Sequence, residues 1–183
     1  SIINLNFRYY FYSILTILFQ FLFLAFLKDF EHFNKYIEIF SLSIIVIGIF
    51  GSIQFYFIKE NNQLIGIRIN KNVRIFFPLI VSIAFIYYLY HDLRFGLFFL
   101  SAIILSSIVL YQGAVYANMN HSFYNSKFTL IVSSFKFFLL LILTLFSNNI
   151  FVILICSNLI IIFIWVFFYY KSTLFEENGY SLF

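Results

Sequence analysis

Six long apolar runs restrict what this chain can fold into. They cover approximately residues 9–27, 37–58, 75–90, 95–117, 128–146 and 150–170. A transmembrane helix needs about 20 mostly apolar residues, and most of the runs are near that length. In hydrocarbon a segment must satisfy its own backbone hydrogen bonds, which favours helices, because strands would need a closed barrel with alternating polar residues. We therefore predict an all-α fold, a polytopic transmembrane bundle of about six helices.

The composition supports this prediction and excludes other classes. Of the 183 residues 63% are hydrophobic and 10% charged, whereas soluble domains are about half apolar and a quarter charged. One core of this size cannot bury so much apolar surface, so lipid must be part of the solvent. The single cysteine, Cys156, excludes a disulfide within the chain and any multi-cysteine metal site.

Positive charges predict the orientation. Alternate loops would place seven cations on one side and three on the other, and the more positive side of a membrane protein is cytoplasmic. Both termini are thus expected in the cytoplasm, and the net charge of +4 needs no nucleic-acid partner. The seven are Arg8, Lys59, Arg68, Lys71, Arg74, Lys127 and Lys171, and the three are Lys28, Lys35 and Arg94.

Lys136 is the most informative charge, because it lies inside the fifth apolar run. Thr129 and Ser133 precede it on the same helical face. A lysine at mid-bilayer costs a few kcal/mol and normally faces protein or a wet cavity. Two interpretations stay open: an ammonium that contacts an anionic ligand such as phosphate, or a lysine that snorkels toward the cytoplasmic surface.

Two faces of small residues predict helix packing. In the fourth run Ala102, Ser106, Gly113 and Ala117 share a face, and in the second run Ser41, Gly48 and Ser52 do the same. Membrane helices approach each other through such residues, so both faces are expected to contact other helices rather than lipid. The sequence leaves open whether they also line a cavity.

Catalysis finds little support in the sequence. His91 and Asp92 are neighbours in a tight turn, and His121 has no acid near it. Metal-binding histidine pairs, a glycine-rich phosphate loop and a serine nucleophile motif are all missing. We expect no enzyme activity, no metal and no cofactor.

Several segments resemble the O-antigen type of bacterial polysaccharide flippase, in the multidrug/oligosaccharidyl-lipid/polysaccharide superfamily. Residues 36–42 read Tyr-Ile-Glu-Ile-Phe-Ser-Leu, similar to the family's Tyr-Gly-x-Phe-Ser-Leu, with Ile37 and Glu38 where the family often has glycine. Residues 111–117, Tyr-Gln-Gly-Ala-Val-Tyr-Ala, then Ser-Phe-Tyr at 122–124 and a span with Lys136, look like the family's fourth span, loop and fifth span. The resemblance covers about residues 1–171.

The resemblance implies a fold, a substrate and partners. Residues 1–171 would form one six-helix lobe of a two-lobed transporter, with 172–183 a polar tail or linker, and the second lobe would come from the same full-length chain. Such a protein would flip a polyprenyl-diphosphate-linked oligosaccharide across the bacterial inner membrane, in contact with membrane lipids. Lys136 is the first candidate for the diphosphate contact and Arg8 the second.

Two other classes remain open from the sequence. An accessory or structural subunit of a larger membrane complex would use the six helices only for packing. A glycan-modifying membrane enzyme would need acids and histidines in the loops outside the cytoplasm, where this chain has few.

Overall fold

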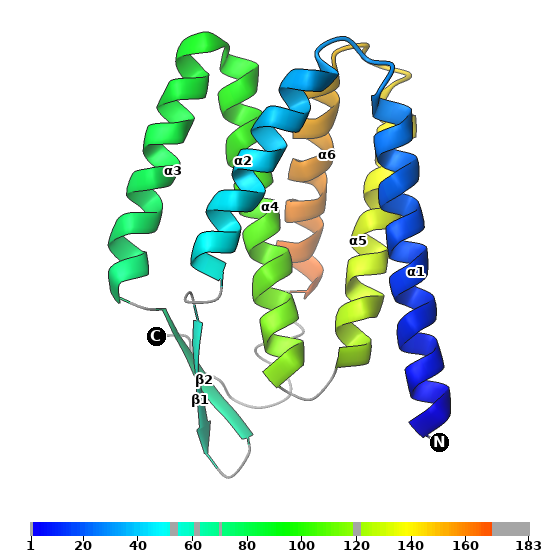
Figure 1. Cartoon of the computed structure of the whole chain (residues 1–183), viewed down its shortest axis with the longest axis vertical. Coiled ribbons are helices and arrows are strands. Elements are labelled where there is room, and N and C mark those ends of the chain that lie inside the picture. Colours follow the sequence, from blue (N-terminus) through cyan, green and yellow to red (C-terminus); the bar gives the residue numbers. More distant parts are fainter. Residues whose placement is uncertain (1, 52–54, 61–62, 70, 119–121, 170–183) are drawn as a thin grey trace.

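In the part of the chain that the structure describes, six long helices form a bundle and run alternately up and down (Figure 1). The computed structural model describes residues 2–51, 55–60, 63–69, 71–118 and 122–169. Its helices are α1 (Ile2–Leu27), α2 (Phe33–Gly51), α3 (Lys71–His91), α4 (Leu93–Asn118), α5 (Ser122–Leu143) and α6 (Ile150–Ile164), and a π-helical turn, Trp165–Tyr169, continues α6. The prediction of a helical membrane bundle is confirmed.

Five of these helices are long and apolar enough to cross a membrane: α1, α3, α4, α5 and α6. The sixth, α2, has 19 residues, or about 28 Å at the α-helical rise, and runs beside them (Figure 1). The chain is therefore a multi-pass membrane protein. Six spans with cytoplasmic termini remain a prediction.

The largest departure from prediction follows α2. This helix ends at Gly51, so the predicted end of the second span at 58 is wrong. Residues Phe55–Glu60 (β1) and Gln63–Ile69 (β2) pair as an antiparallel hairpin beyond the helices, at the end of the bundle where α1 begins (Figure 1). Phe55–Ile58 is a short aromatic run, and an apolar run of that length does not by periodicity distinguish helix from strand.

Helix α4 is the centre of the bundle. It packs against α2, α3, α5 and α6, while α1 packs mainly along α5. The core is built from apolar residues of these interfaces, with Leu27, Ile39, Phe99, Leu140 and Leu154 fully buried. Helix α1 lies on α5 and α2 on α4, and these two pairs meet where α4 packs on α5, with hardly any direct packing between α1 and α2.

Local contacts determine how the helices turn at the end opposite the hairpin. The side chain of Asn149 caps α6 by accepting from the amides of Phe151 and Val152. Between α3 and α4, Gly96 lies so close to Leu89 that a Cβ would be 3.2 Å from its backbone. Helices α3 and α4 therefore meet closely at this end and diverge toward the other (Figure 1). The predicted tail 172–183, with Lys171, lies outside the described residues.

Candidate functional site

A cleft lies between the pair α1/α5 and the pair α2/α4, and it contains the residue that the sequence singled out. Its volume is about 490 Å³, within the usual range of ligand pockets. We call it the Lys136 cleft. Four helices line it: α1 with Phe19, Gln20, Phe23 and Leu24; α2 with Tyr36, Phe40, Ile44 and Ile47; α4 with Leu105, Ser106, Val109 and Leu110; and α5 with Thr129, Val132, Ser133 and Lys136.

Lys136 places its ammonium between two aromatic rings in this cleft. Its Nζ lies 5.1 Å from the ring centroid of Phe23 on α1 and 5.7 Å from that of Phe40 on α2. Among the described residues no carboxylate lies within 4.0 Å of it. Thr129 and Ser133 line the same cleft, as their spacing from Lys136 predicted. The ammonium thus faces an aromatic and hydroxyl surface with no anionic partner among the described residues.

The position of Lys136 along α5 argues against snorkelling toward the end where α5 begins, which the charge bias predicts to be cytoplasmic. Helix α5 begins at Ser122, six residues before the predicted start of the span. The part of α5 that is apolar enough to cross a membrane begins at Tyr124, and Lys136 is 12 residues further on, about 18 Å along the helix. A four-carbon side chain does not span that distance. The charge is instead held in the interior of the bundle, seven residues (about 10 Å) before Leu143, where α5 ends.

The two rings offset a large part of the cost of this charge. A lysine at the centre of a membrane helix costs about 2.5–3.5 kcal/mol on insertion scales. A cation–π contact contributes about 0.5–1 kcal/mol at an exposed site and about 2 kcal/mol when desolvated. The distances of 5.1 and 5.7 Å are toward the long end of the useful range. Two contacts of this kind together contribute about 1–4 kcal/mol, comparable with the cost of the charge.

Arg8 does not join Lys136. It is exposed on the first turns of α1 and is not part of the cleft lining. Twelve residues, about 18 Å of helix, separate it from Gln20, the nearest polar lining residue on α1. The structure therefore does not bring the two predicted anion contacts together.

The two predicted faces of small residues differ in whether they contact another helix. On α4, Ala102 is buried, Ser106 lines the cleft, and a Cβ at Gly113 would lie 3.1 Å from Asn125 Oδ1 of α5. This face meets other helices, as expected, although the side chain of Ala117 is outside the described part.

On α2 the expectation is wrong within this chain. Ser41 and Gly48 are exposed, and nothing lies within 4 Å of a Cβ built at Gly48. Ser52 lies outside the described residues. Small residues permit close packing, but the sequence does not say whether a partner helix is on that side.

Sequence reasoning missed the aromatic part of the site. No role in a site was predicted for Phe23 or Gln20, and Tyr36 and Phe40 entered only as part of the resemblance at residues 36–42. The structure places all four on the lining of the cleft. One signal was available: Tyr36 and Phe40 are four residues apart and share a helical face, and their rings stack at 5.6 Å.

Several polar residues at the end of the bundle opposite the hairpin are paired with one another. Lys35 Nζ donates to both carboxylate oxygens of Glu38, at 2.8 and 2.9 Å, and Tyr88 Oη donates to Glu38 Oε1 at 3.4 Å. In the turn before α4 the Arg94 side chain hydrogen-bonds Asp92 and lowers the pKa of that carboxyl. Across the described ranges no three potential metal ligands cluster. The ion pairs Lys35–Glu38 and Arg94–Asp92 thus lie at this end of the bundle.

Comparison with known proteins adds no assignment. No family model, no curated protein and no solved structure matches this chain. The similarity to polysaccharide flippases therefore remains a prediction from the sequence.

Proposed function

We propose that this chain is a transport lobe of the bacterial inner membrane whose Lys136 cleft binds the diphosphate of a polyprenyl-diphosphate-linked oligosaccharide during its transfer across the bilayer. One observation carries the proposal. A lysine ammonium without a carboxylate partner among the described residues faces a cleft of about 490 Å³ inside a membrane bundle. Such a site selects a ligand that is both anionic and soluble in lipid.

The lining fits the parts of such a ligand. An ammonium in low-dielectric surroundings attracts phosphate strongly, because few waters compete for it. Thr129 and Ser133 carry hydroxyl groups on the same helix, and Gln20 is exposed on the neighbouring helix α1. Phe19, Phe23 and Ile44 offer apolar surface to an isoprenoid chain. Transport would then need alternating access, in which a second lobe moves against this one.

The alternative is an accessory subunit, in which Lys136 has only a structural role. The contacts with Phe23 and Phe40 are the observation that favours it, since they hold the ammonium without any ligand. The two functions differ in whether an added anionic ligand binds in the Lys136 cleft.

Binding of a polyprenyl diphosphate tests the proposal. The purified chain is titrated in detergent with a polyprenyl diphosphate and, separately, with the matching polyprenol that lacks phosphate. We expect the wild-type protein to prefer the diphosphate by at least about tenfold, the lower range for a hydrogen bond to a charged group. Lys136→Ala should remove that preference, and Lys136→Arg should retain part of it, because the charge survives while the geometry changes.

Lys127 provides the matched control. It is an exposed lysine on the same helix, nine residues before Lys136, and it does not line the cleft. Lys127→Ala should therefore keep the preference. In cells, Lys136→Ala in the full-length transporter should stop glycan export at an unchanged protein level. Normal export, or equal binding of diphosphate and polyprenol by the wild type, would refute the anion site.

A further inference from the structure

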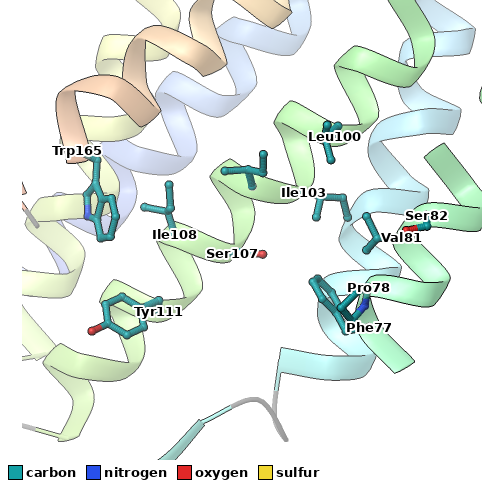
Figure 2. A pocket seen from close by; sticks show the side chains of 11 residues that line it. Phe77, Pro78, Val81, Ser82, Leu100, Ile103, Ser107, Ile108, Tyr111 and Trp165 are labelled. Atoms are coloured by element: carbon teal, nitrogen blue, oxygen red, sulfur yellow. The ribbon is translucent and has the colours of Figure 1, made fainter. Parts of the chain in front are cut away.

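A second recess lies on the opposite side of α4, where α3 diverges from it. Its volume is also about 490 Å³, and we call it the α3/α4 groove. Figure 2 shows α4 between its two flanks, with Phe77 and Pro78 of α3 on one side and Trp165 on the other. The lining is Phe77, Pro78, Val81, Ser82, Leu100, Ile103, Ile104, Ser107, Ile108, Tyr111 and Trp165.

The groove lies in the half of the bundle next to the hairpin, and a cation stands at its end. Arg74 precedes Pro78 by four residues, so it is one helical turn beyond the groove on the same face of α3. Its side chain is exposed and forms no ion pair with any described carboxylate. Tyr111 and Trp165, which line the groove, contact each other edge to face at 6.3 Å, and such aromatic residues commonly lie at the level of lipid headgroups.

The lining favours an acyl chain over a helix as the occupant. Membrane helices pack closely where glycine, alanine and serine let their backbones approach. Apart from Ser82 and Ser107, every lining residue is branched, cyclic or aromatic. Trp165 is also anchored, because its Nε1 donates to Oε1 of the buried Gln112 at 3.4 Å. A slender hydrocarbon chain fits between such walls, whereas a helix backbone would be held away from α4.

We propose that the α3/α4 groove binds an anionic glycerophospholipid of the bilayer, with an acyl chain along α4 and the phosphate at Arg74. This site is separate from the Lys136 cleft and does not depend on the proposed transport function. The charge supplies the selectivity: a basic residue near the membrane surface favours anionic lipid by about 1 kcal/mol, or about fivefold.

Trp165 is an intrinsic probe of the groove, because it is the only tryptophan in the chain. The full chain is reconstituted in phosphatidylcholine nanodiscs that contain increasing fractions of phosphatidylglycerol with dibrominated acyl chains, which quench tryptophan fluorescence on contact. A parallel series uses dibrominated phosphatidylcholine. We expect half-maximal quenching at an approximately fivefold lower fraction of the anionic lipid.

Three variants assign this selectivity to the groove. Arg74→Gln should make the two lipids equivalent, while Arg74→Lys should retain the preference. Ser107→Phe, which fills the floor of the groove, should reduce quenching by both lipids. Lys127→Gln removes an exposed cation near the same end of the bundle and should change nothing.

Three results would overturn the proposal. Equal quenching by both lipids in the wild type would show that the groove does not select an anionic headgroup. A preference that persists in Arg74→Gln would assign it to general attraction of anionic lipid. Absence of quenching by either lipid would indicate that a protein segment covers Trp165.

Discussion

The two recesses that flank α4 have the same volume and opposite chemistry. Each encloses about 490 Å³. The Lys136 cleft holds an ammonium in its interior, whereas the α3/α4 groove has no charged lining residue and a cation only beyond its end. Volume therefore says little about what binds. The position of the charge determines the kind of ligand. In the Lys136 cleft the anionic group of the ligand must enter the bundle, whereas in the α3/α4 groove it stays at the membrane surface.

The largest expected effect concerns the membrane topology. Both recesses flank α4, so their comparison requires that α4 crosses the membrane. Reporter fusions after Lys127 and Lys171 should report the cytoplasm, and a fusion after Arg94 the opposite side, because of the bias of positive charge. The measurement is the all-or-none activity of a compartment-specific reporter. Identical sides for Arg94 and Lys127 would contradict a membrane-spanning α4 and with it the comparison.

Removing each charge in turn, and measuring both binding assays on each variant, should show that the two recesses are independent sites. Lys136→Ala should lower affinity for polyprenyl diphosphate by at least about tenfold and leave the quenching of Trp165 by anionic lipid unchanged. Arg74→Gln should have the converse effect, an approximately fivefold loss in the quenching assay only. If either variant altered both readouts equally, the two recesses would belong to one site.

The contact between α4 and α5, two of the helices that line the Lys136 cleft, should depend on the small size of Gly113. A leucine at Gly113 must displace Asn125, whose Oδ1 would lie 3.1 Å from the new Cβ. We expect Gly113→Leu to lower the free energy of unfolding by about 1–3 kcal/mol, measured by titration with denaturing detergent. Gly48→Leu is the matched control, because the space around Gly48 is open. Equal stability of both variants would show that α4 and α5 separate without cost.

The smallest effect is expected where α4 meets α6, which carries the Trp165 wall of the groove. Asn158 Nδ2 donates to Ser101 Oγ at 3.1 Å, and both residues are buried. A double-mutant cycle with Asn158→Leu and Ser101→Ala should give a coupling energy of about 0.6 kcal/mol, typical of polar pairs between membrane helices. A value near zero would mean that apolar packing alone holds α6 on α4.

The sequence determined the class of the protein and the positions of most helices. In lipid a long apolar segment must form its backbone hydrogen bonds internally, and a helix does so. Five of the six predicted spans accordingly correspond to helices of the structure. The same periodicity placed Thr129, Ser133 and Lys136 on one face, and the structure has them in one cleft. Local pattern was sufficient for these features, because each depends on residues of a single helix.

Tertiary structure decided everything that involves a second helix. Gly113 and Gly48 both lie on faces of small residues, but only the face of Gly113 packs against another helix. Arg8 and Lys136 are both cations within predicted spans or at their ends, and only the packing of α1 on α5 shows that they are far apart along the bundle. The rings of Phe23 and Phe40 reach Lys136 from two other helices. The physical reason is that helices in lipid lack a hydrophobic force that fixes their neighbours, so shape and a few polar contacts choose them.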